Sequence, residues 1–162
     1  VYFMEFGEFG TMRPFACNLI KRIVPFGFLL VFIGCGGSLP ASIGDFAPCP
    51  ESPRCVSTKS SSEEQGIQPI KYLISKEAAK QGLLEIVRKM PGAEIKINRE
   101  YFVHSEFTSS VMGFVDDVEF YFEESGVINF KSSSRIGYYD FDTNRNRMEE
   151  IRKQFSAVSG VK

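Results

Sequence analysis

The sequence has no tryptophan, only one histidine and only four cysteines among its 162 residues. It also has no block of like charge, because 19 Lys and Arg residues nearly balance 20 Asp and Glu residues, for a net charge of −1. A protein that binds nucleic acid through its phosphates normally needs a basic face, so this composition argues against a nucleic-acid partner. The length and the 43% hydrophobic content are typical of one globular domain with appendages.

The apolar run near the N-terminus is too short for a typical membrane-spanning helix. It reads IVPFGFLLVFIG at residues 23–34, whereas a spanning helix needs about 20 apolar residues. Lys21 and Arg22 precede it, and a Gly/Ser/Pro break follows at residues 36–40. A basic segment, a short apolar run and a break of this kind predict an export signal. An uncleaved anchor is the alternative.

The end of this run resembles a bacterial lipobox, Phe-Ile-Gly-Cys at residues 32–35. The resemblance implies that Cys35 carries the lipid, palmitate included, and becomes the first residue of the mature protein. We expect the signal to span residues 12–35, with residues 1–11 as an upstream extension. The predicted location is the cell envelope, with the protein attached to a bacterial membrane by its lipid anchor and the domain in the periplasm or outside.

Two cysteines, Cys49 and Cys55, remain after the signal, in the stretch CPESPRC. A pair of cysteines in an oxidising compartment predicts a disulfide, whereas a metal site would need two more soft ligands. A redox-active pair is the alternative, although the C-x₅-C spacing differs from that of thioredoxin. We expect the Gly/Ser/Ala/Pro-rich residues 36–48 to form a tether and residues 49–158 to form the folded domain.

The domain has patterns for two helices and about four strands. Ser75 can cap a helix that runs to about Met90, where Pro91-Gly92 stops it, and a second helix begins near Thr143 or Asn144 and runs to about Ser156. Strands are expected at 93–98, 101–108, 113–123 and 127–133, joined by short turns. This order predicts an α+β fold in which an antiparallel meander packs with the helices.

The third expected strand carries charge on its core face. In FVDDVEFYF, residues 114–122, alternation places Asp116 with Phe114 and Phe120, and places Asp117 with Glu119 on the other face. A carboxylate buried among phenylalanines needs an arginine partner or a proton. We therefore expect an ion pair between Asp116 or Asp117 and Arg135 or Arg145 that joins this strand to the last helix.

Polar residues of this region form one candidate network or site. Its members are His104, Ser109, Asp116, Asp117, Glu119, Arg135, Asp140, Asn144, Arg145, Arg147 and Glu149. We interpret it as a network that holds the fold, because its charges can be paired internally. The alternative is a hydrolase-like or metal-dependent enzyme that uses Asp116, Asp117, Glu119, Arg135 and Asp140. However, neighbouring strand residues point to opposite faces, and no nucleophile-elbow glycine pattern accompanies His104 and the serines. No cofactor or metal is predicted.

Three segments carry a resemblance to a known family. CPESPRCVST, FVDDVEF and KSSSRIGYYDFDTNRNRMEEIR, in this order and spacing, resemble the DUF1499 family of uncharacterised bacterial and plant proteins, from about Cys49 to Phe155. Two residues depart from its pattern, namely Arg54 where asparagine is expected and Asp142 where glycine is expected. The resemblance supports the fold and implies no reaction.

The expected function is therefore that of an exported lipoprotein with a non-catalytic binding or structural role. Its membrane partner is reached through the lipid anchor. The abundant phenylalanines could line a cavity for a hydrophobic small molecule or simply fill the core. An envelope protein is the other expected partner.

Overall fold

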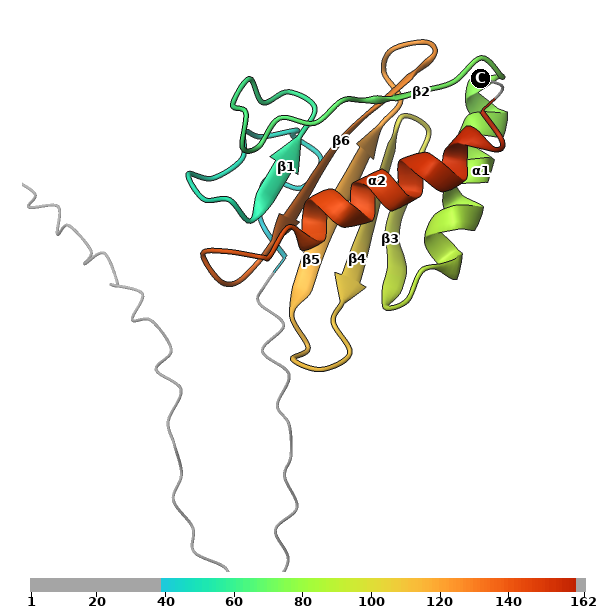
Figure 1. The fold of residues 1–162 in the computed structure, drawn as a ribbon. Coiled ribbons are helices and arrows are strands. Elements are labelled where there is room, and N and C mark those ends of the chain that lie inside the picture. Colours follow the sequence, from blue (N-terminus) through green and yellow to red (C-terminus); the bar gives the residue numbers. More distant parts are fainter. Residues whose placement is uncertain (1–38, 160–162) are drawn as a thin grey trace, which may run out of the picture. The chain divides into compact units, whose positions relative to one another are not determined.

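The computed structural model describes residues 39–159 (Figure 1). The predicted signal and Cys35, the predicted lipidation site, lie outside the described residues. The elements follow in the order β1 (Cys55–Ser57), β2 (Ile70–Lys71), α1 (Lys76–Lys89), β3 (Ala93–Arg99), β4 (Phe102–Thr108), β5 (Val115–Tyr121), β6 (Val127–Ser134) and α2 (Thr143–Ser156). The predicted α+β class is confirmed.

The sheet has six antiparallel strands, so the expected number of about four was too low. The meander β3–β4–β5–β6 is present as predicted, with β5 in the middle. β1 pairs with β6 on the side away from β5, and β2 pairs with the first residues of β6. These two strands have three and two residues, too few to show an alternating pattern in the sequence. Helix α2 crosses one face of the sheet, and α1 packs against β3 and α2 (Figure 1).

Helix α1 begins and ends where its local signals predict. The Ser75 hydroxyl accepts a hydrogen bond from the backbone N–H of Ala78 at 3.2 Å, which satisfies one of the first-turn donors. After the helix, Gly92 has φ +72°, and a Cβ atom there would lie 2.2 Å from the carbonyl oxygen of Thr108. Only glycine fits this approach, so the Pro91-Gly92 stop also sets how closely the turn packs on β4.

Helix α2 spans the predicted residues but has a different cap. Asp142 occupies the N-cap position in the left-handed conformation, with φ 60°, and its side chain makes no capping hydrogen bond. The carboxylate of Asp140 accepts the hydrogen bond from the N–H of Asn144 instead, at 2.9 Å. The carboxylate that caps the helix therefore lies two residues before the residue in the N-cap position.

The core lies between the sheet and the two helices. Its largest fully buried side chains include Phe120, Phe122, Phe130 and Phe155. Most of the phenylalanines in the domain therefore fill the core, which is the simpler of the two expected roles. Phe114 is 42% exposed, since β5 begins one residue later at Val115, so its predicted place on the core face was wrong.

The face of the sheet opposite α2 is covered by residues 40–50, although residues 36–48 were expected to form a tether. The N–H of Gly44 donates to Glu119 at 2.7 Å, and the N–H of Phe46 donates to the hydroxyl of Tyr121 at 2.9 Å. The rings of Phe46 and Tyr121 stack with centroids 4.1 Å apart. The predicted disulfide joins Cys49 to Cys55 and fixes the end of this segment to β1.

Candidate functional site

Strand β5 sends two consecutive aspartates to opposite faces of the sheet. Asp116 lies on the face that α2 covers, and Asp117 lies on the face that residues 40–50 cover in part. Both are nearly buried, with 7% and 4% of their surface exposed. Each is the centre of a polar network, and we call the two the helix-face network and the open-face network.

The helix-face network joins β5 and β6 to α2. Arg147 donates to Asp116 at 2.5 Å and to the side-chain oxygen of Asn144 at 2.7 Å, and its guanidinium lies over the ring of Phe107. Asn144 is completely buried, and its oxygen also accepts from the hydroxyl of Ser132 at 2.5 Å. The amide nitrogen of Asn144 donates to Ser134, to Asp140 and to the backbone oxygen of Arg54. This network saturates the buried amide.

The open-face network has Arg135 at its centre. The guanidinium makes a bidentate contact with Asp117, at 2.8 Å from Nε and 2.7 Å from Nη2, and Nη2 also contacts Glu106. His104 is fully buried, and its Nε2 lies 2.8 Å from the same carboxylate. Lys96 lies 3.3 Å from Glu106 at the edge of the network. Two carboxylates and two cations therefore balance in charge, and the imidazole lies within hydrogen-bond distance of one of the carboxylates.

The two carboxylates and the arginine of the open-face network are held in their ionised forms. Burial by itself would raise the pKa of Asp117, but hydrogen bonds from Arg135 and His104 outweigh it and hold the pKa below its ordinary value. Burial opposes ionisation of Glu106 in the same way, and Arg135 and Lys96 lower its pKa. The contact with Asp117 raises the pKa of Arg135 further above its ordinary value. Asp117 is thus a poor general acid.

The predicted ion pair is present in one of its four combinations, Asp117 with Arg135. This pair joins β5 to the end of β6 and does not reach the last helix, so the predicted link to α2 is made by other residues. Arg147 makes that link through Asp116. Arg145 was wrong as a carboxylate partner, because it donates to the backbone oxygens of Glu64 and Gly66 at 2.8 and 3.0 Å. Glu149 pairs with Arg152 on the surface of α2 at 2.9 Å.

The residues of the enzyme alternative do not meet at one point. His104 touches Asp117, but its Nδ1 has no hydrogen-bond partner among residues 39–159. The Ser109 hydroxyl accepts from the N–H of Phe114 in the β4–β5 loop. Asp140 belongs to the helix-face network, on the other side of the sheet from Asp117 and Glu119. Within the described part of the chain, no group of three or more His, Cys, Asp or Glu side chains could hold a metal ion.

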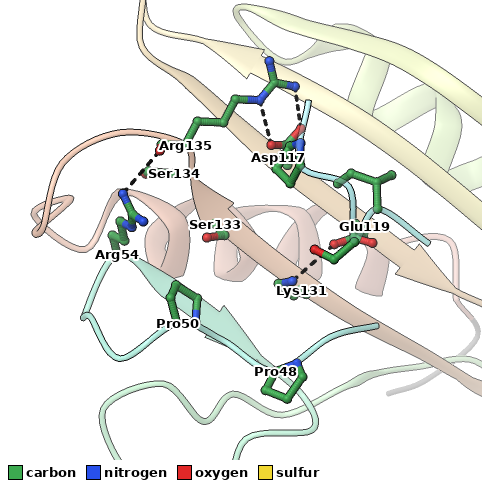
Figure 2. A pocket seen from close by; sticks show the side chains of 12 residues that line it. Pro48, Pro50, Arg54, Asp117, Glu119, Lys131, Ser133, Ser134 and Arg135 are labelled. Carbon is green, nitrogen blue, oxygen red and sulfur yellow. Dashed lines mark hydrogen bonds and ion pairs between the residues drawn. The ribbon is translucent and has the colours of Figure 1, made fainter. Parts of the chain in front are cut away.

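A pocket of about 300 Å³ lies between residues 40–50 and the open face of the sheet (Figure 2). Its floor is formed by side chains of β5 and β6, and its wall is formed by the covering segment. The lining residues are Pro40, Ser42, Ile43, Pro48, Pro50, Arg54, Asp117, Glu119, Lys131, Ser133, Ser134 and Arg135. The pocket therefore opens directly onto the open-face network.

Three of the four carboxylate oxygens in this pocket accept hydrogen bonds, namely both oxygens of Asp117 and Oε2 of Glu119. The Oε1 of Glu119 has only the ion pair with Lys131. Glu119 accepts from the N–H of Gly44 and, at 2.5 Å, from the hydroxyl of Tyr121. Burial, followed by the contact with Glu119, raises the pKa of Tyr121, so that the phenol remains a donor. Lys131 is buried, and its ammonium lies 3.6 Å from Glu119, beyond the usual hydrogen-bond distance of about 2.7–3.2 Å.

Two further donors line the same pocket. Among residues 39–159 the Ser133 hydroxyl has no hydrogen bond, and the Nε of Arg54 is buried without a partner. The other end of Arg54 is fixed, because its Nη1 donates to the backbone oxygens of Arg135 and Gly137. Figure 2 shows Ser133 and Lys131 along β6, between Arg54 and Glu119.

Two pocket residues, Lys131 and Ser133, were not predicted from the sequence, and neither was Tyr121, which donates to the pocket residue Glu119. A pairing signal was available, since Glu119 and Lys131 are opposite each other in the β5–β6 ladder, and opposite charges at such positions attract. The register could not be read from the sequence, and neither could the return of residues 40–50 to this face. Arg54 stood out in the sequence only as a departure from a family pattern.

Comparisons with known proteins give one positive result. None of the helices in residues 39–159 is long and apolar enough to cross a membrane. No curated protein and no solved structure matches the chain. The family model "Protein of unknown function (DUF1499)" matches residues 45–155, which include both networks and most of the pocket. The chain therefore belongs to the DUF1499 family.

Proposed function

We propose that this protein is an exported, membrane-anchored binding module that holds a small molecule with an anionic group in the pocket of Figure 2. The observation that supports the proposal is that the pocket lining has more open hydrogen-bond donors than open acceptors. Its carboxylates already accept short hydrogen bonds, whereas Lys131, Ser133 and Arg54 retain donors. A ligand that brings oxygen acceptors would complete this set.

The charge of the lining favours an anion over a cation. Three cationic residues and two carboxylates line the pocket, an excess of one positive charge. Asp117 and Arg135 cancel each other through their bidentate contact. Lys131 is a buried ammonium whose ion pair with Glu119, at 3.6 Å, is longer than a hydrogen bond, so its N–H donors remain open to a second acceptor. A carboxylate or a phosphate would supply that acceptor.

The covering segment favours an apolar part in the same ligand. Pro40, Ile43, Pro48 and Pro50 form the wall opposite the charged floor. A pocket of about 300 Å³ is at the lower end of the range typical of small-molecule sites. The ligand that fits this lining is a short amphiphile, with its acidic group on β6 and its apolar part against the prolines.

Two features support a non-catalytic role in an oxidising compartment. Asp117 is held ionised by Arg135 and is therefore a poor proton donor, and Oε2 of Glu119 already accepts from a backbone amide and a phenol. The disulfide Cys49–Cys55 pins the pocket wall to β1, and disulfides persist mainly outside the reducing cytoplasm. The disulfide thus agrees with the export signal predicted from residues 12–35.

The test is a calorimetric titration of the purified full chain with hexanoate and with hexyl phosphate, and hexanol serves as the uncharged control. Both anions are expected to bind more tightly than hexanol. Lys131→Met should weaken binding roughly tenfold or more, because it removes the charge that faces the ligand. The control variant Lys89→Met changes an exposed lysine at the end of α1, outside the pocket, and should leave binding unchanged. Equal binding of hexanol, or no effect of Lys131→Met, contradicts the proposal.

A further inference from the structure

We infer that the domain docks on a lipid surface through one end of its sheet. The docking surface consists of two neighbouring loops, and we call it the loop-tip patch. Its members are Val111, Met112 and Phe114 of the β4–β5 loop and Ile136, Tyr138, Tyr139 and Phe141 of the β6–α2 loop. The inference shares only the membrane anchoring with the proposed function and does not depend on the pocket.

The ladder brings the two loops together. Asp116 of β5 pairs with Ser134 of β6, and the N–H of Arg135 donates to the carbonyl of Val115 at 3.0 Å. The β4–β5 loop therefore ends beside the point where the β6–α2 loop begins. Figure 1 shows both loops at the same end of the sheet, opposite the β3–β4 turn.

Exposed apolar side chains are concentrated on this patch. It holds seven of the eleven exposed large hydrophobic residues among those described. Val111, Phe141 and Tyr138 are 85%, 82% and 73% exposed. Scattered exposed apolar residues are ordinary on a protein surface, but a contiguous group marks an interaction site.

The backbone holds these side chains outward. Ser109 closes the first loop by accepting hydrogen bonds from Gly113 and Phe114. In the second loop Phe141 has φ 55°, a left-handed conformation that is unfavourable for a bulky residue. Its ring meets only the ring of Tyr139, edge to face at 5.2 Å, among the ring contacts of the described residues. Packing within the domain does not account for this arrangement, whereas an external apolar partner would.

The path of the chain favours a lipid surface as that partner. Phe46 contacts Tyr121 and Gly44 contacts Glu119, so the chain, followed back towards its N-terminus, passes from Tyr121 to Glu119, in the direction of the start of β5. Phe114 of the patch directly precedes that start. The apolar run at residues 23–34 ends six residues before Pro40, a distance of at most about 20 Å for extended chain. A membrane that holds this run or a lipid at Cys35 would therefore lie within reach of the patch.

The side chains of the patch suit the boundary of a bilayer. Tyrosine is enriched at membrane–water interfaces, where its ring is in the apolar zone and its hydroxyl in the headgroups. Tyr138 and Tyr139 lie close to the strained Phe141 in the same loop, and the β4–β5 loop from Ser109 to Phe114 carries no charge. In this orientation the pocket of the proposed function lies just above the headgroups.

The absence of tryptophan allows a clean test. Tyr139→Trp puts a single fluorophore in the patch, and Tyr101→Trp puts one at the β3–β4 turn at the other end of the sheet. The two positions are matched in exposure, at 50% and 47%. The full chain of each variant is reconstituted into phosphatidylcholine vesicles with and without bromine on the acyl chains, and flotation confirms attachment to the vesicles.

The expected result for Tyr139→Trp is a roughly twofold or greater loss of tryptophan fluorescence in brominated vesicles, because an interfacial aromatic lies within reach of the acyl chains. The Tyr101→Trp variant should show no such loss. Adding Met112→Ser and Phe141→Ser to Tyr139→Trp should restore its emission.

Three outcomes would overturn the inference. The first is equal quenching in the two tryptophan variants, and the second is no quenching of Tyr139→Trp on vesicles that float with the protein. The third is self-association that shields the patch fluorophore without quenching it, which would assign the patch to a second copy of the chain. The titration with hexanoate tests the pocket separately.

Discussion

Strand β5 buries one aspartate on each face of the sheet, and the two carboxylates are paired in different ways. On the helix face, Asp116 reaches Arg147, and the arginine is enclosed by Asn144 and the ring of Phe107. On the open face, Asp117 reaches Arg135 and His104 beneath a segment that leaves a pocket of about 300 Å³. Both aspartates are nearly buried, so burial alone does not distinguish a structural network from a candidate binding site.

The difference lies in which groups remain unsaturated. Asn144 uses both its oxygen and its nitrogen within the helix-face network. The helix-face network leaves one buried acceptor, the Oδ1 of Asp140, without a hydrogen-bond partner among residues 39–159. The open face pairs Asp117 with Arg135 but leaves Lys131 and Ser133 as donors facing a pocket. The kind and position of the unsatisfied groups therefore locate the candidate site better than counting charged residues does.

The largest expected effect is that of Arg135→Ala. The substitution leaves Asp117 and Glu106 without their common partner in a site where the arginine side chain is only 7% exposed. Removing one partner of a buried pair typically costs about 3–5 kcal/mol of unfolding free energy. Urea unfolding followed by circular dichroism measures this loss. The exposed Arg88→Ala provides the control and should change stability by less than about 0.5 kcal/mol.

A second variant tests whether that loss of stability comes from the unpaired carboxylates. Arg135→Met combined with Asp117→Asn removes both charges of the bidentate contact and should recover part of the stability lost in Arg135→Ala. A loss below about 1 kcal/mol for Arg135→Ala would show that water already screens the open face. The two faces would then differ in how strongly water screens their ion pairs, although their aspartates are similarly buried.

A smaller loss is expected for Arg147→Ala on the helix face. Asp116 and Arg147 line a depression of about 690 Å³ at the end of the sheet, so water can reach the carboxylate after the substitution. The lost charged hydrogen bonds, including the one to Asn144, should cost about 2 kcal/mol. The same urea experiment measures it, and Arg147→Lys, which keeps the charge, should lose less. A loss greater than that of Arg135→Ala would reverse the proposed ranking of the faces.

The smallest expected effect concerns acid stability. The folded-state pKa of Asp117 is below its ordinary value of 3.8, so its stabilising contribution is complete above that pH and is lost as the pH falls through the folded-state pKa. Unfolding free energy should decrease more steeply below about pH 4 in the natural protein than in Asp117→Asn. Asp142→Asn changes an exposed carboxylate and should keep the natural slope. Identical slopes in all three proteins would exclude Asp117 as the acid-sensitive group.

The parts of the fold with strong local signals could be predicted from the sequence. The Ser75 cap and the Pro91-Gly92 stop defined α1, and alternation defined the four strands of the meander. β1 and β2 could not be found, because they are short and are held by pairing with the distant β6. The pattern of residues 40–48 likewise gave no sign that they return to the sheet, since single backbone hydrogen bonds and one ring stack hold them there.

The candidate site was predictable only to the level of residue types. Alternation correctly separated Asp116 from Asp117, and arginine was the right kind of partner for both. The choice among Arg135, Arg145 and Arg147 depends on how α2 is rotated over the sheet, which sequence spacing does not fix. The donors of the pocket were missed for a related reason, because Lys131 becomes informative only once the β5–β6 register and the covering segment are known.

The amide of Gly44 has a practical consequence for anyone who expresses this domain alone. A fragment cut at Cys49, the first landmark visible in the sequence, would remove one hydrogen-bond donor from Glu119 and uncover the ring of Tyr121. Its recombinant yield and solubility would then reflect a sheet face that the truncation had exposed, and not a property of the natural domain. The natural starting point for such a fragment lies upstream of Pro40.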